Sequence, residues 1–324
     1  MKWKTLTSVI TGALALVGAV QAEQGGEGHY LSGATASFID ALPDKPGWIL
    51  ESLFMNYHGT YGVAHGLPYG DNIALNVSAD ASAESALVMY SPPFHILGGN
   101  PSFAVAIPYA WVDVKASVTV DKAGVTHPSG QSDKANGIGD IEFWPFMLGW
   151  ARNDFKYDVR CGIYAPSGGY DKTHLANTGL GYWTFEPEVT FSWLTSKSLW
   201  SSKIGTEVSV FTGLDFNMKN MDTDYQSGDI FHIDCTVAEH LVLFGGDAGV
   251  GVNAFYYKQF TGDSGTGARL GSFEASAYGI GPVLSYVRKI GKTDLIIEAK
   301  WLPQLDTQNT TKGNYVWIKA ALMF

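Results

Sequence analysis

Charged side chains recur along this chain with a single residue between them. Lys156, Asp158 and Arg160 follow one another in this way, and so do Glu186 and Glu188. Comparable stretches hold Asp140, Glu142, Lys203, Glu207, His232, Asp234, Glu298, Lys300 and Lys319. Side chains of both signs brought to one place can form ion pairs, exchange protons or line a polar path. Burying one such charge unpaired costs several kcal/mol, so each needs a partner or water beside it.

The residues between these charges are apolar, which predicts the element that positions them. In "FKYDVRCGIYA", Phe155, Tyr157 and Val159 alternate with the charges, and "WTFEPEVTFSW" and "TDLIIEAKW" alternate in the same way. A period of two is that of a β-strand, which presents the charges on one face and the apolar side chains on the other. The pattern therefore predicts strands between an apolar and a polar environment.

Segmenting the chain on this period predicts an all-β fold with a fixed rhythm of connections. We expect twelve strands near residues 48–58, 73–90, 101–121, 137–150, 155–166, 182–195, 202–217, 227–239, 242–258, 269–288, 293–303 and 314–324. Connections after the odd-numbered strands are long and rich in Gly, Asp, Thr and Ser. Several of the others are tight, such as "ARND", "EHL" and "KIGKT". This rhythm is typical of a transmembrane β-barrel, whereas a secreted β-sandwich or jelly roll gives no reason for it.

Composition and the two ends of the chain agree with a barrel. The sequence is 46% hydrophobic and 16% charged, with 38 glycines, and its formal net charge of −10 argues against nucleic-acid binding. The first 22 residues, "MKWKTLTSVITGALALVGAVQA", have the features of a secretory signal with cleavage after Ala22. We therefore predict a signal peptide at 1–22, a separate segment at 23–47 and an outer-membrane barrel at 48–324. This barrel would be a monomer in a Gram-negative bacterium, with both ends of the mature chain in the periplasm.

The segment between the signal and the first strand is a candidate plug. Phe38, Ile39 and Leu42 could lie on a short helix that starts near Ser37 and ends at Pro43. We expect it to fold into the lumen or across the periplasmic mouth as a plug or gate. A flexible lead-in to the barrel is the alternative that the sequence leaves open.

Strand parity assigns side chains to the lumen, and the loops offer aromatic rings. All the charged residues named above are placed in the lumen, together with Asp80, Glu84, Asp113, Lys115, Asp247 and Glu274. They predict either a structural network that fills a narrow barrel or a polar path whose acidic bias favours cations and neutral polar groups. Flat apolar surface in the long loops is expected from Tyr61, Tyr69, Tyr170, Tyr182 and Tyr225.

The sequence does not favour an enzyme, a metal site or a cofactor. An outer-membrane phospholipase needs a Ser/His pair with an orienting Asn, but "NYHGTYG" around His58 has no serine at a suitable spacing. The chain has no G-x-S-x-G, and its glycine-rich stretches do not open helices. Cys161 and Cys235 fall on strands that are not neighbours, so a disulfide is not expected.

Several stretches of the mature chain resemble one family. "EGHYLSGATASFIDALPDKPGWIL", "LGGNPSFAVAIPYAWVDV", "NGIGDIEFWPFMLGW" and "YGIGPVLSY" are similar, in order and spacing, to outer-membrane proteins called "MetA-pathway of phenol degradation". The resemblance implies a barrel associated with the degradation of aromatic and other hydrophobic compounds, in their uptake. The final strand, with alternating apolar residues up to Phe324, also resembles the signal that barrel assembly machinery reads.

Two functions follow as expectations. The first is a channel that passes small hydrophobic molecules, with outer-membrane lipid and the assembly machinery as its other partners. The second is a structural or adhesive barrel with a closed lumen that acts through its loops.

Overall fold

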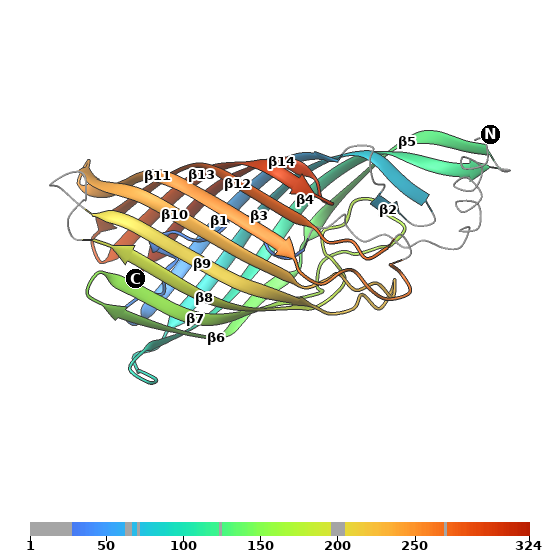
Figure 1. Cartoon of the computed structure of the whole chain (residues 1–324). Helices are drawn as coiled ribbons and strands as arrows, with labels where there is room; N and C mark the ends of the chain where they lie inside the picture. Colours follow the sequence, from blue (N-terminus) through green and yellow to red (C-terminus); the bar gives the residue numbers. More distant parts are fainter. Residues whose placement is uncertain (1–27, 62–66, 70–71, 123–124, 196–204, 269–270) are drawn as a thin grey trace, which may run out of the picture.

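The computed structural model describes residues 28–61, 67–69, 72–122, 125–195, 205–268 and 271–324. The predicted Lys203 lies outside these ranges. One antiparallel sheet closes on itself into a barrel (Figure 1). Its wall is made by β1 (Gly47–Tyr61), β3 (Asn72–Ser91), β4 (Asn100–Lys122), β6 (Ile141–Arg152), β7 (Phe155–Ala165), β8 (Thr184–Leu194), β9 (Thr206–Asn217), β10 (Ile230–Leu243), β11 (Gly246–Gln259), β12 (Ser276–Ile290), β13 (Thr293–Gln308) and β14 (Lys312–Met323).

These twelve strands confirm the predicted number. Pairing of β1 with both β14 and β3, and of β3 with β4, closes the ring. The closing seam extends to the last residue, since the N–H of Trp48 donates to the carbonyl of Phe324 at 2.8 Å. None of the helices among the described residues is long and apolar enough to cross a membrane.

Two further strands lie outside the ring of twelve. The short β2 (Leu67–Tyr69) pairs with β3, and β5 (Val125–Ile138) pairs with the second half of β4. The stretch "DKAGVTHPSGQSDKAN" was expected as a loop, but most of it continues β4 and forms β5 in a long hairpin. Residues 125–138 pair along the whole of residues 109–122, so β4 supplies the backbone partners that hold this Gly-, Pro- and Ser-containing stretch as a strand.

The break between β5 and β6 matters for the interior of the barrel. Both strands pair with β4, β5 with residues 109–122 and β6 with residues 100–106. Gly139 and Asp140 lie between them outside any strand, and the N–H of Gly139 donates to the carbonyl of Pro108 at 2.9 Å. Because Asp140 is not part of a strand, its carboxylate can form hydrogen bonds with His29 and with the loop after β7.

The short turns and the long loops lie at opposite ends of the barrel. Turns at 153–154, 244–245 and 291–292 join β6 to β7, β10 to β11 and β12 to β13. Gly245 and Gly291 have φ of +75° and +67°, the left-handed conformation that tight hairpin turns require. Loops 166–183 and 218–229, and the described residues 260–268 and 271–275, lie at the other end (Figure 1). The connection between β13 and β14 was expected to be long, but it contains only residues 309–311.

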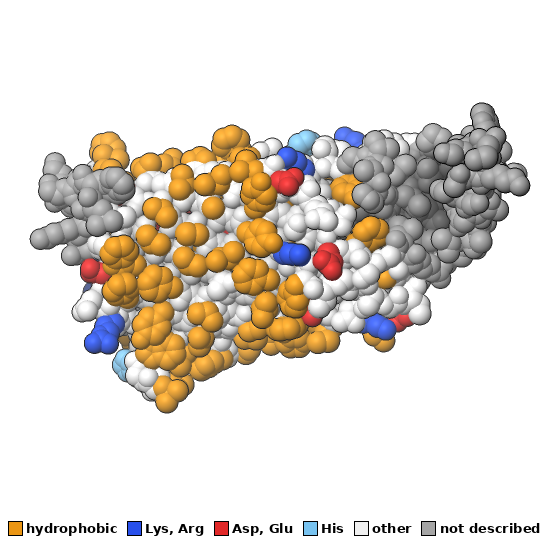
Figure 2. Space-filling model, in the orientation of Figure 1, with side chains coloured by type: hydrophobic (Ala, Val, Ile, Leu, Met, Phe, Trp, Pro, Cys, Tyr) orange, Lys and Arg blue, Asp and Glu red, His pale blue; other side chains and the backbone are white. Residues whose placement is uncertain are grey.

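The outside of the barrel is apolar over the strands. Hydrophobic side chains form a broad band on the face shown in Figure 2, and most of the visible charges lie to either side of it. On the outside of the barrel, Phe191 on β8 and Leu284 on β12 are exposed, and Trp301 on β13 is 52% exposed. A closed barrel satisfies its backbone internally and tolerates such an apolar exterior only against lipid. This is the architecture of a transmembrane barrel.

Candidate functional site

The segment that precedes β1 lies inside the barrel. It contains one 3-10 turn, η1 (Phe38–Asp40), and its residues contact side chains from strands on several sides of the lumen. The carboxylate of Asp234 on β10 accepts two hydrogen bonds from it, from the Tyr30 hydroxyl at 2.7 Å and the Gly33 N–H at 2.9 Å. Of the short helix predicted from the sequence, the structure has only this three-residue 3-10 turn.

Lysines from β13 and β14 hold the middle of this segment. Lys300 donates to the carbonyls of Gly33 at 3.1 Å and Thr35 at 2.7 Å. Lys319 forms an ion pair with Asp40 and lies 3.7 Å from Oε1 of Glu298. Both ammonium groups are buried, so each depends on these acceptors.

Two more strands contact the same turn. Glu207 on β9 accepts a hydrogen bond from the N–H of Phe38 at 2.7 Å. Arg160 on β7 donates to the carbonyl of Asp40 at 3.2 Å while its guanidinium forms a two-point pair with Asp158 at 2.8 and 2.9 Å. The guanidinium carbon also lies 5.2 Å from the centre of the Phe211 ring. The turn is therefore bonded to β7, β9 and β14 at once.

His29 joins the beginning of the segment to the break in the barrel wall. Its ring nitrogens lie 2.7 Å from the Thr184 hydroxyl and 3.0 Å from the carboxylate of Asp140. Asp140 also accepts hydrogen bonds from the N–H groups of Gly168 and Leu180. Its place between β5 and β6 lets it bridge the loop after β7 and the segment inside the barrel.

We call the interior faces of β7 to β10, β13 and β14 the charged wall. It consists of Asp158, Arg160, Glu186, Glu188, Glu207, Asp215, His232, Asp234, His240, Glu298, Lys300 and Lys319. Eleven of these are fully buried and the twelfth, Arg160, is half-buried with its side chain only 7% exposed. Such a density of buried charge requires that partners be supplied across strands, as the contacts above supply them.

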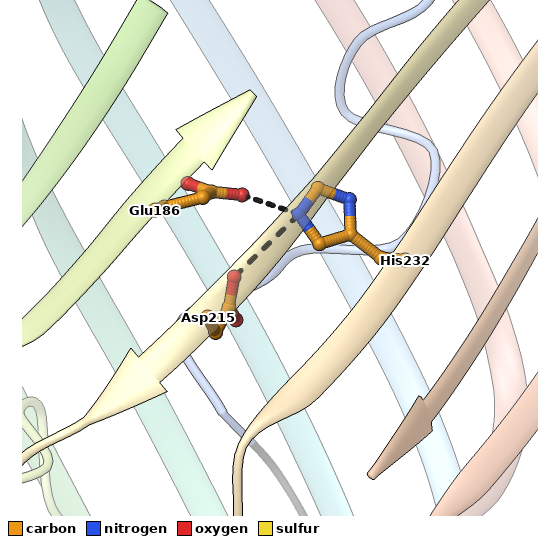
Figure 3. A group of neighbouring side chains, drawn as sticks. All are labelled: Glu186, Asp215 and His232. Atoms are coloured by element: carbon orange, nitrogen blue, oxygen red, sulfur yellow. Dashed lines mark ion pairs between the residues drawn. The ribbon is translucent and has the colours of Figure 1, made fainter. Parts of the chain in front are cut away.

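Three side chains of the charged wall converge at one point (Figure 3). The Nε2 atom of His232 on β10 lies 2.8 Å from Oε1 of Glu186 on β8 and 3.5 Å from Oδ1 of Asp215 on β9. The ring of Tyr30 stacks on His232 with centroids 4.2 Å apart. Three neighbouring strands thus bring one imidazole and two carboxylates together beside Tyr30 of the N-terminal segment.

A second histidine lies in a comparable place nearer the short turns. His240 contacts Glu207 through Nε2 at 2.8 Å and Asp247 through Nδ1 at 3.1 Å, and Phe38 packs edge-on against its ring. Both ring nitrogens of His240 therefore have a hydrogen-bond partner.

The rest of the interior, from β1 to β4, is apolar and borders open space. We call it the apolar wall, formed by β1, β3 and β4 through Leu53, Met55, Ala81, Ala83, Leu87, Met89, Ala106, Pro108, Ala110 and Val112. These residues, the N-terminal segment and part of the charged wall line a cavity of about 370 Å³. Small side chains on β3 and β4 leave this space.

Most of the charged residues predicted to face the lumen do so, but those on β3 and β4 and one in a loop do not. The described ones on β6, β7 to β10, β13 and β14 lie inside, although Lys156 is only half-buried. Asp80 and Glu84 on β3, and Asp113 and Lys115 on β4, are instead on the outer face, and Glu274 is in an exposed loop. The error arose because both faces of β3 and β4 are apolar, so parity could not tell inside from outside.

The predicted loop aromatics and plug residues differ from one another in how deeply they are buried. Tyr182 and Tyr225 are buried, so they offer no open surface, whereas Tyr61 and Tyr170 are half-buried. The side chain of Tyr69 lies outside the described part. Of the plug residues, Leu42 is buried beside Ala104 and Met147, and Phe38 and Ile39 are half-buried.

Sequence reasoning missed Asp215, His29 and His240. Asp215 has the same parity on β9 as Glu207, so the alternation that found Glu207 could have found it too. His240 likewise shares the parity of His232 on β10. His29 carried no signal, because its partners lie 111 and 155 residues away.

The fold of the barrel is shared with a solved structure. The chain is similar to the COG4313 outer membrane channel from Pseudomonas putida F1, with a TM-score of 0.63 and 11% identity over 90% of this chain and 100% of that one. A Pseudomonas aeruginosa FadL homologue matches with a TM-score of 0.43 and 10% identity, over 94% of this chain and 99% of that one. The first likeness shows a shared fold.

Family comparison is more specific. No curated protein matches the chain. The model of the family "Putative MetA-pathway of phenol degradation" matches residues 64–320, which include the strands from β2 to most of β14. The chain therefore belongs to this family.

Proposed function

We propose that this protein is an outer-membrane channel for the uptake of small hydrophobic or aromatic compounds that are then degraded. The observation that carries the proposal is the cavity of about 370 Å³ between the apolar wall and the N-terminal segment. Binding sites of a few hundred cubic ångströms, mostly apolar and with a few polar groups, suit molecules of one or two rings. The family description, which refers to phenol degradation, supports the same class of cargo.

The N-terminal segment is proposed as the gate of this channel. Its polar contacts go largely to the charged wall, from Asp234, Glu207, Arg160, Lys300 and Lys319. It also supplies Tyr30, Ile39 and Ala41 to the lining of the cavity. A displacement of the segment would therefore change the outline of the cavity without disturbing the apolar wall.

Uptake of a labelled aromatic hydrocarbon by cells with and without the gene tests the function. Ala106 lines the cavity, and Ile107, the next residue on β4, is 46% exposed on the outside. Ala106→Trp should reduce uptake to near that of the deletion strain, whereas Ile107→Trp should leave it unchanged. Equal uptake by the two variants would remove the cavity from the transport path.

Conductance of the purified barrel in planar bilayers tests the gate. Deleting residues 23–44 should raise single-channel conductance, because it removes the segment from the lumen. Unchanged conductance after this deletion would exclude a gating role.

The dense ion pairing around the segment favours one other function, a closed barrel that acts through its loops. Unchanged uptake in the deletion strain together with no conductance would support that alternative. Large unselective conductance of the intact protein would instead indicate a general porin.

A further inference from the structure

The convergence of Glu186, Asp215 and His232 has features that ion pairing alone does not explain. Their ligating atoms all lie within 4.8 Å of one another, and the three residues are 4%, 0% and 2% exposed. Among the described residues, neither oxygen of Asp215 and neither ring nitrogen of His232 has a hydrogen bond of good geometry. Buried polar groups are normally satisfied, so unsatisfied ones point to a missing partner.

Carboxyl groups cluster around the same point. A Cβ at Gly162 would lie 2.7 Å from Oε1 of Glu142 and 3.3 Å from Oε2 of Glu186, so these two carboxylates face the same small space. Oε1 of Glu142 also has no hydrogen-bond partner among the described residues. The nearest guanidinium, that of Arg160, is already held at two points by Asp158. The cluster therefore has more buried carboxylates than cations to balance them.

Glycine provides the room in which the imidazole lies. Gly213 is opposite His232 in the register of β9 and β10, and a Cβ there would be 2.5 Å from Nε2 of the ring. The same Cβ would be 2.9 Å from Cγ of Glu188. A side chain at Gly213 would occupy the space in which the ring nitrogen approaches Asp215 on β9 and Glu186 on β8.

We propose that Glu186, Asp215 and His232 bind a divalent transition-metal ion of the zinc class. Zinc bonds of about 2.0–2.2 Å at tetrahedral angles place neighbouring ligand atoms about 3.4 Å apart. The distance of 3.5 Å from Asp215 to His232 fits, and the 2.8 Å from Glu186 to His232 requires a small outward movement of a carboxylate. An imidazole ligand favours zinc-class ions over Ca²⁺ and Mg²⁺, which prefer oxygen ligands.

The ion would be reachable and would leave a coordination position open. Glu186 and His232 both line the cavity, so an ion could enter and leave through that space. Three protein ligands leave the fourth tetrahedral position for water or for an oxygen atom of a bound molecule. The stacked ring of Tyr30 would then rest on a metal-bound imidazole, which couples the site to the N-terminal segment.

His240 supplies a matched control within the same barrel. It is also a buried histidine between two carboxylates, but its two ring nitrogens are bonded to Glu207 and Asp247 on opposite sides. The ring nitrogens thus point to different acceptors and do not share one ion-sized space. The described residues hold no other three-residue group with metal-ligand spacing besides Glu186, Asp215 and His232.

Metal binding by the purified barrel tests the proposal. The protein in detergent micelles is stripped with a chelator and titrated with Zn²⁺ against a fluorescent competitor, and with Co²⁺ by visible absorption. We expect about one ion per chain and a cobalt spectrum of low coordination number. His232→Gln and Asp215→Asn should weaken zinc affinity by about a hundredfold or more, whereas His240→Gln should leave it unchanged.

Two outcomes would overturn the site. One is that the unaltered barrel binds no zinc, which would leave His232 as an imidazole packed between two carboxylates. The other is that His240→Gln lowers the affinity as much as His232→Gln does. Folding of each variant is checked by its heat-modifiable mobility on gels. Should the variants not fold, zinc-edge X-ray absorption of the unaltered barrel decides, because it must show one imidazole and otherwise oxygen ligands.

Discussion

The charged wall and the apolar wall enclose one lumen and are built by different rules. On the charged wall, Lys319, Arg160 and Asp234 each bind a partner on the N-terminal segment. On the apolar wall, Ala83 and Ala106 are small and border open space. The charged wall therefore anchors the segment, while the apolar wall leaves room beside it.

Physical chemistry predicts different responses to mutation on the two walls. A buried charge depends on its partner, and removing the partner leaves the charge unsatisfied. An apolar residue depends on volume, and its replacement matters through the space gained or lost. Variants on each wall therefore test whether charge pairing and volume govern the stability of the two walls separately.

The largest effect is expected for Lys319→Met. This change leaves Asp40 and Glu298 without the ammonium group that lies between them in the buried charged wall. We expect the barrel to lose about 3–5 kcal/mol of unfolding free energy, as when one member of a buried pair is removed. Denaturant unfolding in lipid vesicles, followed by tryptophan fluorescence, measures this loss.

Lys219→Met is the control, because Lys219 pairs with Asp224 in an exposed loop. Its unfolding midpoint should stay close to that of the unaltered protein. Similar losses for the two variants would mean that burial does not distinguish the charged wall from the loops.

A smaller effect is expected on the apolar wall. Met55 is 8% exposed, belongs to a buried cluster with Phe255 and Trp317, and borders the cavity. Met55→Ala should cost about 2 kcal/mol, the lower end for such truncations, because open space already lies beside the side chain. Met55→Leu should cost less than about 1.5 kcal/mol, since it keeps the volume. A loss for Met55→Ala as large as that for Lys319→Met would contradict the comparison of the walls.

The same two walls separate what the sequence predicts from what it does not. On β7 and β8 the outer residues are strongly apolar and many of the inner ones are charged, so alternation separates the face of Arg160 and Glu188 from the outer face. On β3 and β4, Ala and Val occupy both faces, and the few charges, such as Glu84 and Asp113, were assigned to the wrong side. Alternation identifies a strand reliably but identifies its inner face only when the two faces differ.

Local sequence patterns do not predict which side chains contact each other in the lumen. The contact between Lys319 and Asp40 joins residues 279 positions apart, and no periodicity along β14 indicates it. A 3-10 turn of only three residues, Phe38–Asp40, is likewise specified by the wall around it as much as by its own sequence. The strands could be predicted because their signal is local, whereas the site is assembled by closure of the barrel.

Gly213→Ala tests how tightly the charged wall is packed. The new methyl group would be 2.5 Å from Nε2 of His232 and would force the ring away from β9. We expect a loss of about 1–3 kcal/mol, typical of overpacking. Gly130→Ala is the control, because a Cβ at Gly130 meets no atom within 4 Å. Equal stability of the two variants would mean that the imidazole has free space, against the close fit that the structure shows.

The smallest effect concerns a charged pair outside both walls, in the loops. Asp224 accepts hydrogen bonds from Lys219 at 2.7 Å and from the N–H of Thr266 at 3.1 Å. The Lys219 bond, followed by those from Thr266, lowers the pKa of Asp224 from 3.8 to about 2. A carboxylate with a lowered folded-state pKa stabilises its loop above the unfolded pKa, and this contribution is lost as the pH falls through the folded pKa.

Protection of the Thr266 amide against hydrogen exchange measures this contribution to the loop. After correction for the intrinsic exchange rate, protection should stay constant from neutral pH to about pH 4 and fall toward about pH 2, while the barrel strands stay protected. Asp224→Asn should remove this pH dependence, because the amide does not titrate. If protection of the Thr266 amide in the unaltered protein were already lost at about pH 5, this would contradict the lowered pKa of Asp224. Because Asp224 is solvated, the fall should be slight beside the effect of Lys319→Met, and that contrast separates charges that lie in water from charges that depend on the barrel interior.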